Sequence, residues 1–321
     1  MSVNLIICTY GAKYSVIDKK NYLKILLSIL NNINTSVDRI TIMKPKIDKE
    51  DIPYQNYYNF DDIEISNIKN KIKVVECENI GISYGQFLTG ICNDLNFDYY
   101  IFTEDDYIPF YDNFDIYLKN EVNVLNSYLC VFYYKNKKWI LNNNLHNCRN
   151  EFININSYNK QIINKMNEPF FVPDHSCGII SNKTFIKVLN TFGSLDNLLK
   201  LFRFNCEKSH IWIHQVVFGY MFYLSDVHIE DLGSKNLPLF YATGACINIC
   251  YDDSTINIEN LNENINYHLD IPIFVPLEFF NPYYQNYNIN NLKKYIKDFD
   301  NFLNQYNKLN SEMKLLSTNL L

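Results

Sequence analysis

Residues 98–106, Asp98-Tyr99-Tyr100-Ile101-Phe102-Thr103-Glu104-Asp105-Asp106, place an apolar, aromatic run directly before three carboxylates. The apolar run predicts a buried β-strand, and the carboxylates then lie at its carboxyl end. Open α/β sheets bind ligands outside the carboxyl ends of their strands. The sequence therefore predicts an acidic ligand site at this edge of a sheet.

Three strand-like runs precede this segment, at Val3–Cys8, Asp38–Met43 and Ile72–Cys77. Helical spacing of apolar residues connects the first two, from Tyr22 to Ile33, and a second helix with Ser83 as its cap is expected from Ser83 to Leu95. Strands that alternate with helices are typical of a mainly parallel sheet. We therefore expect an α/β fold.

Further elements are expected on both sides of the acidic segment. The polar, tyrosine-rich residues 48–70 are interpreted as an irregular connection. The later expected elements are a hairpin of residues 128–134 and 137–141, a strand within 170–180, and helices at 183–192, 195–204 and 210–224. We expect one domain over residues 1–245, followed by a carboxyl-terminal extension, 246–321, that ends in a helix near 289–309.

Composition excludes several classes of protein. The formal charge of −6 over 321 residues argues against a protein that coats nucleic acid, which needs a basic face. Nine cysteines at irregular spacing, with no Cys-x-x-Cys pair, indicate free thiols rather than a zinc site.

The opening apolar run is too short for a secretory signal, and no run is long enough to span a membrane, so a cytoplasmic location is expected. Abundant Asn, Ile, Lys and Tyr are typical of an A+T-rich coding sequence, as in a large DNA virus or some protists.

The acidic triplet Glu104-Asp105-Asp106 needs a compensating charge if it is buried, because neighbouring carboxylates resist ionisation together. A divalent cation supplies that charge. Oxygen ligands suit Mg²⁺ or Mn²⁺, and such a metal stabilises a diphosphate leaving group. A solvated acidic turn is the alternative interpretation.

The order of three segments resembles the family-2-like GT-A glycosyltransferases. These segments are Ile6–Tyr10, the loop Glu78-Asn79-Ile80-Gly81-Ile82-Ser83, and the strand that ends in Glu104-Asp105-Asp106. The family shows an Asn-x-Gly segment, a helix and then an aspartate-x-aspartate motif. The match covers residues 3 to 108, and Glu104 stands where the family has its first aspartate.

The resemblance implies a GT-A three-layer sandwich. It also implies a metal-assisted, inverting transfer of a sugar from a nucleotide-diphosphate donor to a glycan or protein acceptor. The donor-binding residues that it implies are Thr9, Tyr10, Gly11, Asn79, Gly81, Glu104 and Asp105. Asp106 and Glu104 are the implied metal ligands, and His228 is a further candidate ligand.

The second half of the chain is expected to supply the acceptor site. The segment Asp174–Ser181 resembles one that lies beneath the donor sugar in these enzymes, and 210–219 resembles a helix that begins with a Glu-Asp pair. Here that pair becomes His214-Gln215, so the catalytic base is open among His214, Asp174 and Glu207. A retaining transfer would need no such base.

Two other functions share this pattern. A nucleotidyltransferase that makes sugar nucleotides has a similar fold and acidic site, but usually carries a glycine-rich, arginine-containing loop after its first strand, where this chain has Thr9–Tyr14. A binding or structural protein could keep the fold without turnover. No Gly-x-x-x-x-Gly-Lys motif is present, which argues against a P-loop enzyme.

Overall fold

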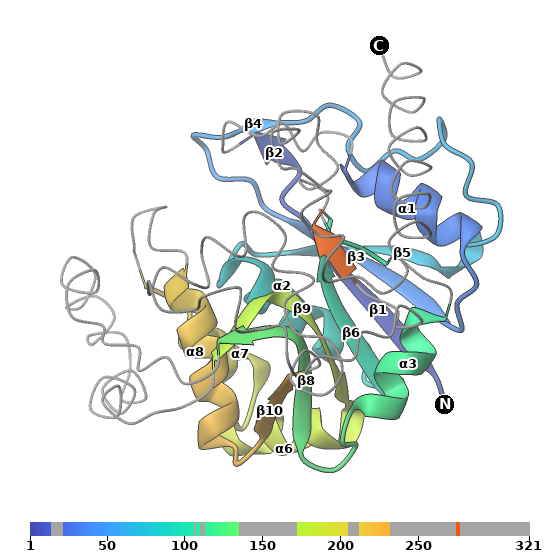
Figure 1. The fold of residues 1–321 in the computed structure, drawn as a ribbon. Coiled ribbons are helices and arrows are strands. Elements are labelled where there is room, and N and C mark those ends of the chain that lie inside the picture. Colours follow the sequence, from blue (N-terminus) through green and yellow to red (C-terminus); the bar gives the residue numbers. More distant parts are fainter. Residues whose placement is uncertain are drawn as a thin grey trace, which may run out of the picture.

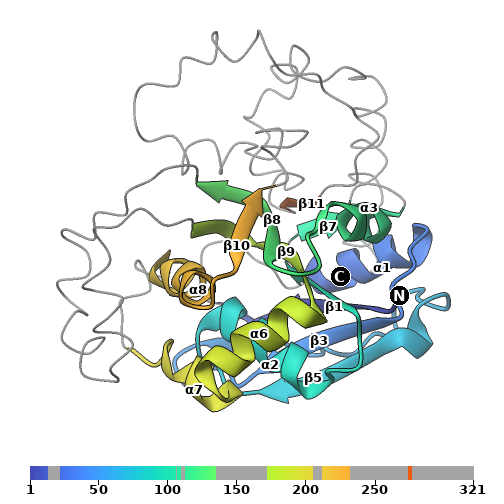
Figure 2. The ribbon, with the colours of Figure 1, turned by 90° about the horizontal axis from the view of Figure 1, so that it is seen from below.

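The computed structural model describes residues 1–13, 22–105, 107–109, 113–134, 172–204, 212–231 and 274–276. These residues form three layers, in which a central sheet is covered by helices on both faces (Figures 1 and 2). The predicted α/β class with a mainly parallel sheet is confirmed. No helix in this part of the chain is long and apolar enough to cross a membrane.

The central sheet has seven strands in the order β10-β8-β9-β6-β1-β3-β5. They are β1 (Val3–Cys8), β3 (Arg39–Pro45), β5 (Ile72–Cys77), β6 (Tyr99–Glu104), β8 (Ser127–Tyr134), β9 (Val172–Ser181) and β10 (His228–Asp231). Strand β9 runs antiparallel to both of its neighbours, and every other pair is parallel. The strands on the β5 side follow the order third, second, first, fourth along the chain, as in doubly wound folds.

Six helices cover this sheet. They are α1 (Tyr22–Asn32), α2 (Ile82–Asn93), α3 (Phe114–Glu121), α6 (Asn182–Phe192), α7 (Leu195–Lys200) and α8 (Trp212–Leu224) among the described residues. Figure 2 shows α1 and α3 on one side of the sheet and the other four on the opposite side. Helix α7 is shorter than predicted, because the chain turns at Leu201 and Phe202, whose N–H groups donate to Leu198 and Leu199.

The strands are fixed in the sheet by burial on both faces. Along β6, Tyr99 and Ile101 join the hydrophobic cluster under α1 and α3, whereas Tyr100 and Phe102 join the cluster under α2 and α8. Phe102 stacks on Phe87 of α2, with ring centroids 4.4 Å apart. Burying one such side chain contributes roughly 1.5–3 kcal/mol. The two clusters therefore determine which β6 residues face which layer.

The predicted cap of α2 is wrong. Helix α2 begins one residue earlier, after Gly81, which adopts φ 73° and makes no side-chain cap; Ser83 lies inside the helix. A Cβ atom at Gly81 would lie 2.7 Å from Cγ of Phe202. Both the positive φ and the close approach of the Phe202 ring therefore favour glycine at the residue before the helix.

Short strands connect segments outside the central sheet. Strand β2 (Ala12–Lys13) pairs with β4 (Ile52–Pro53), and β7 (Tyr107–Pro109) pairs antiparallel with β11 (Phe274–Pro276). The predicted irregular connection thus contains β4 and a 3₁₀ turn, η1 (Lys69–Lys71). The expected second hairpin strand, 137–141, and the helix near 289–309 lie outside the described residues, and the division at residue 245 stays a prediction.

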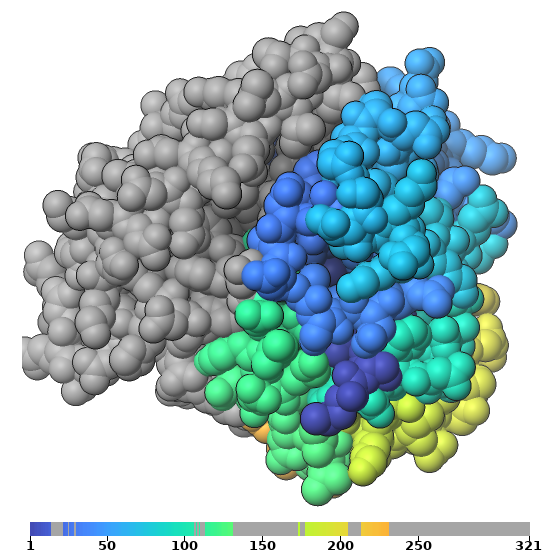
Figure 3. All heavy atoms as spheres, turned by 90° about the vertical axis from the view of Figure 1, so that its right-hand side faces the viewer, coloured from blue at the N-terminus to red at the C-terminus, as the bar shows by residue number. Residues whose placement is uncertain are grey.

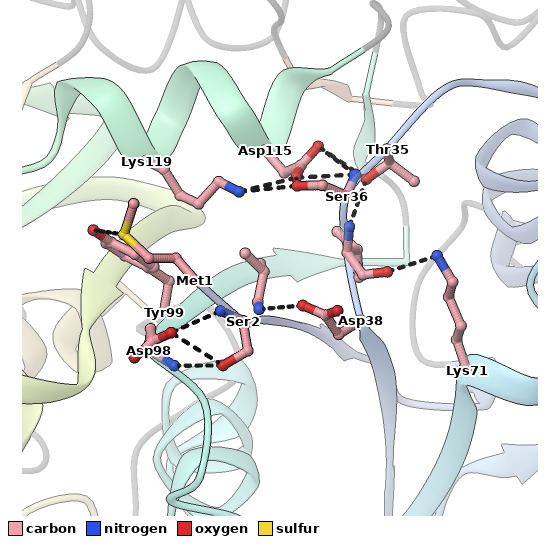
Figure 4. A network of polar contacts seen from close by, with 12 residues as sticks. Met1, Ser2, Thr35, Ser36, Asp38, Lys71, Asp98, Tyr99, Asp115 and Lys119 are labelled. Atoms are coloured by element: carbon pink, nitrogen blue, oxygen red, sulfur yellow. Dashed lines mark hydrogen bonds and ion pairs between the residues drawn. The ribbon is translucent and has the colours of Figure 1, made fainter.

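A polar network holds the amino edge of the sheet (Figure 4). Asp98 accepts a hydrogen bond from the Ser2 N–H at 2.7 Å. Asp115, which is fully buried, accepts from the Thr35 hydroxyl at 2.9 Å and from the Ser36 N–H. Figure 3 shows the start of the chain, in dark blue, at the surface beside the green segment that contains α3. Asp98 therefore joins the start of β1 to β6, and Asp115 joins α3 to the segment that precedes β3.

The packing of α2 gives a test of the fold. A Cβ atom at Gly85 would lie 1.7 Å from the Ile80 carbonyl oxygen, whereas at Gly90 it would meet only side-chain atoms of Ile6 and Met43, at 2.9 Å or more. We expect Gly85→Ala to destabilise the protein by about 3 kcal/mol or more. Gly90→Ala should change stability by less than about 1 kcal/mol, since a gain in helix propensity offsets the contact. Urea denaturation of both variants measures the difference; equal effects would contradict this account of how α2 packs.

Candidate functional site

The candidate site lies where β1 and β6 end side by side. Their parallel register runs from Val3 opposite Tyr99 to Cys8 opposite Glu104, and the Asp105 N–H donates to the Cys8 carbonyl at 3.1 Å. After β1 the chain passes through α1, on one face of the sheet, to β3. After β5 it returns through α2, on the other face, to β6 on the far side of β1. A strand order that reverses at this point leaves a crevice outside the carboxyl ends.

Two acidic side chains occupy this edge. Asp105 is buried, at 6% exposure, and Glu104 is half-buried. Burial raises the pKa of the Cys8 thiol well above its usual range, and the charges of Glu104 and Asp105 raise it further. Both carboxylates therefore act electrostatically on the end of β1. Asp106 lies outside the described residues.

Gln86 of α2 fixes the turn after β1. Its amide accepts a hydrogen bond from the Thr9 N–H at 3.0 Å and donates one to the Thr9 carbonyl at 2.8 Å. Gln86 and Thr9 are both buried. Because this one amide pairs with both backbone groups of Thr9, α2 determines the direction in which the chain leaves β1.

The Thr9 side chain is used to hold the turn. Its hydroxyl donates to the Met43 carbonyl at 2.7 Å, so at the 2.7 Å contact with Tyr58 the tyrosine hydroxyl is the donor. Burial raises the pKa of Tyr58, which keeps that hydroxyl protonated. The structure therefore gives Thr9 a structural role, and its predicted contact with a nucleobase stays a prediction.

Tyr10 and Gly11 continue the turn along the same segment. The Tyr10 hydroxyl donates to the Asp51 carboxylate and lies 3.0 Å from the Asp48 carboxylate, and burial, followed by the Asp51 hydrogen bond, raises the pKa of Tyr10. Gly11 adopts φ 70°, and its carbonyl accepts from the Tyr54 N–H at 2.9 Å. The predicted donor residues 9–11 thus form one turn against residues 48–58.

A tyrosine-rich segment, residues 54–58, is the part of the site that the sequence analysis missed. Tyr54 binds the Gly11 carbonyl, Tyr58 binds Thr9, and the Tyr57 hydroxyl donates to the Asp105 carboxylate. The rings of Tyr57 and Tyr58 meet edge to face with centroids 5.0 Å apart. The signal in the sequence was the tyrosines themselves, which are unusual in an otherwise polar connection.

The second group of predicted residues meets around Phe202. Gly81 packs directly on Phe202, whose ring lies 6.2 Å from that of His214, and His214 also stacks on Phe204 at 4.7 Å. His214 is buried, at 7% exposure. The structure therefore brings His214 to the loop that carries Asn79 and Gly81, but it packs this histidine among aromatic rings.

The other candidates for the catalytic base are only partly described. Asp174 lies in β9, four residues before Gly178, which pairs with Phe102 of β6. Because β9 runs antiparallel, the Asp174 backbone lies toward the carboxyl edge of β6, on the side of the acidic segment. Glu207 lies outside the described residues.

His228 lies at the opposite edge of the sheet. It starts β10 and pairs with Ser127 at the start of β8, which is parallel to β6. Glu104 is at the carboxyl end of β6, whereas His228 is level with the amino ends of these strands. The register therefore does not bring His228 to the acidic segment, and we leave it out of the proposed metal site.

The donor set suits a hard cation. Glu104 and Asp105 are consecutive residues at the end of β6, and both offer carboxylate oxygens. Oxygen atoms are the ligands that Mg²⁺ and Mn²⁺ prefer. Among the described residues, no three His, Cys, Asp or Glu side chains form a metal-binding group. A cation at this edge would therefore be held by Glu104 and Asp105 together with Asp106 or a ligand's oxygens.

Fold and site together define an open α/β protein with acidic side chains at its strand-order reversal. The sequence matches no known protein-family model and no curated protein. A similar solved structure is that of the galactosyltransferase LgtC in complex with donor and acceptor sugar analogues, with 10% identity, a TM-score of 0.41 and 74% of each chain covered. Another is the glycosyltransferase GlyE of Streptococcus pneumoniae TIGR4, with 13% identity, a TM-score of 0.42, and 86% of this chain but 54% of that chain covered.

The Gln86 amide gives the first test of this site. Gln86→Leu leaves the buried N–H and carbonyl of Thr9 without their side-chain partner, so we expect a loss of about 2–5 kcal/mol in the free energy of unfolding. Thr89→Ala on the same helix removes only a hydroxyl bond to the Gly85 carbonyl and should cost less than about 0.5 kcal/mol. Chemical denaturation compares the two. Equal losses would show that Gln86 does not hold the turn.

Thiol labelling tests the electrostatics beside Asn79. Burial, and then the charge of Glu78, raise the pKa of Cys77 from 9.0 to about 11. Since the thiolate is the reactive form, iodoacetamide at pH 8 should label Cys77 roughly a hundredfold more slowly in the folded than in the unfolded protein. Glu78→Gln should speed labelling of Cys77 but not of Cys92, whose raised pKa comes from burial alone. Site-resolved mass spectrometry measures both rates, and an equal change at both cysteines would contradict the role of Glu78.

Proposed function

We propose that this protein is a metal-assisted glycosyltransferase of the GT-A type, which transfers a sugar from a nucleoside-diphosphate donor to a saccharide or protein acceptor. The observation that supports this function best is the junction of the Thr9–Gly11 turn with Glu104 and Asp105 at the strand-order reversal. A nucleoside would lie along the turn and its diphosphate near the acids. A bound cation would supply the positive charge that lets carboxylates serve an anionic ligand.

The proposed chemistry divides between two parts of the crevice. Glu104, Asp105 and Asp106 would hold Mn²⁺ or Mg²⁺, which when bound stabilises the charge of the departing diphosphate. The Gln86 amide fixes the turn along which the nucleoside would lie. These residues orient the donor before the transfer begins.

An inverting transfer needs a group that removes the proton from the attacking hydroxyl of the acceptor. Asp174 lies toward the edge that carries the acids, which favours it as the base. His214 is packed between aromatic rings near Gly81, and Glu207 remains a candidate from the sequence. Of the three residues, we propose Asp174 as the catalytic base. We also propose that the protein acts in the cytoplasm.

Ligand-dependent melting tests the proposed donor site. We expect one of UDP, GDP, CDP and ADP to raise the melting temperature in the presence of Mn²⁺, since a ligand that binds only the folded state stabilises it. Asp105→Asn and Asp106→Ala should each abolish the metal-dependent part of the shift. Asp226→Asn is the matched control: this exposed residue lies before β10 at the other edge, with φ 52°, which asparagine tolerates.

The outcomes separate the three candidate functions. A shift lost in both acid variants but kept in Asp226→Asn supports the donor site. Hydrolysis of the matching sugar nucleotide then distinguishes an enzyme from a binding protein, and a preference for nucleoside triphosphates would indicate a nucleotidyltransferase. The absence of a shift with any nucleotide, with or without Mn²⁺, would contradict the proposed function.

A further inference from the structure

Tyr57, in the tyrosine-rich segment 54–58, contacts the acidic segment through Asp105. Its hydroxyl donates a hydrogen bond to Oδ2 of Asp105, and both residues are buried, at 3% and 6% exposure. They are 48 positions apart in the chain. A buried carboxylate is stabilised by donors, and a hydrogen bond to a charged acceptor is stronger than one between neutral groups.

The Tyr57 ring has little freedom to move. It stacks on Tyr54 with centroids 5.7 Å apart, meets Tyr58 edge to face, and belongs to the hydrophobic cluster under α1 and α3. Because the ring is packed on several sides, the position of the Tyr57 hydroxyl is fixed. The Asp105 side chain that accepts from it is therefore restricted to the rotamers that reach this point.

The same short segment also contacts the turn after β1. Tyr54 donates its N–H to the Gly11 carbonyl, and the Tyr58 hydroxyl donates to Thr9. Three nearby residues thus contact both parts of the proposed donor site, the turn for the nucleoside and the acid for the diphosphate. This arrangement fixes the distance between the two parts.

We propose that Tyr57 is a positioning residue, which orients the Asp105 carboxylate for metal-dependent binding of the diphosphate. Tyr57 acts through Asp105 and has no separate contact with the metal. This inference rests on the proposed function. Tyr58 instead donates to Thr9 in the turn after β1, so each of the two neighbouring tyrosines holds a different part of the site.

The test compares two variants that each lose one hydroxyl. Tyr57→Phe and Tyr58→Phe keep their rings, and both are titrated by calorimetry with the nucleoside diphosphate that gives the largest shift among UDP, GDP, CDP and ADP, with Mn²⁺ and with EDTA. We expect Tyr57→Phe to weaken binding roughly ten- to a hundredfold with Mn²⁺, as for loss of a hydrogen bond to a charge, and to leave binding in EDTA unchanged. Tyr58→Phe should affect both conditions equally.

A double variant tests whether Tyr57 acts through Asp105. If it does, Tyr57→Phe combined with Asp105→Asn should bind no more weakly than Asp105→Asn alone, because the second change removes what the first one orients. Additive losses would overturn the proposal. So would equal losses with Mn²⁺ and EDTA in Tyr57→Phe, or a Tyr57→Phe protein that is unfolded at the assay temperature, since either result assigns Tyr57 a structural role.

The same titrations separate this inference from the proposed function. Wild-type protein without any Mn²⁺-dependent binding contradicts the function and the role of Tyr57 together. Wild-type protein that binds with Mn²⁺, beside a Tyr57→Phe variant that binds equally well, overturns only the inference and leaves the donor site in place.

Discussion

The parallel pairing of β1 with β6 is the constraint on which the rest of the site depends. Because side chains alternate along a strand, a slip of one residue would turn Glu104, at the end of β6, to the opposite face of the sheet. The register is fixed along the strands by burial of Tyr99 and Ile101 on one face, and at the amino edge by the hydrogen bond between Ser2 and Asp98. The network at the amino edge therefore contributes to the geometry of acids at the opposite edge.

The carboxylates at the two edges of the sheet have different surroundings. Asp115 at the amino edge is fully buried and accepts from hydroxyl and N–H donors of residues 35 and 36, with Lys119 3.8 Å away. At the carboxyl edge, Asp105 accepts a hydrogen bond from the Tyr57 hydroxyl, and burial, together with the charges of Glu104 and Asp105, raises the pKa of the neighbouring Cys8 thiol. Acidic residues that share one sheet therefore differ in what they can do, and their position at a strand end decides this.

Much of the fold could be predicted from local sequence, because β1, β3 and β6 are apolar runs that are almost entirely buried, and helices α1 and α2 each bury an apolar side. The features that could not be predicted depend on contacts between distant residues. Before α2, the Phe202 ring, more than a hundred positions away in the chain, leaves no room for a side chain at Gly81. Likewise, no local sequence pattern indicates the hydrogen bond between Tyr57 and Asp105. Nor does one indicate the pairing of β10 with β8, which places His228 at the edge opposite the acids. The acidic segment itself was recognisable because it combines a strand with its charged end.

The later part of the chain also contributes to the geometry of the acidic segment. Strand β7 follows Asp106 directly and pairs with β11, residues 274–276 of the predicted extension. Asp105 therefore lies between two paired strands, β6 before it in the chain and β7 after it. Fixing both ends of a short connection removes much of its conformational freedom before any ligand binds, and this lowers the entropic cost of binding. The pairing of β7 with β11 is therefore one of the contacts that hold the acidic segment in place.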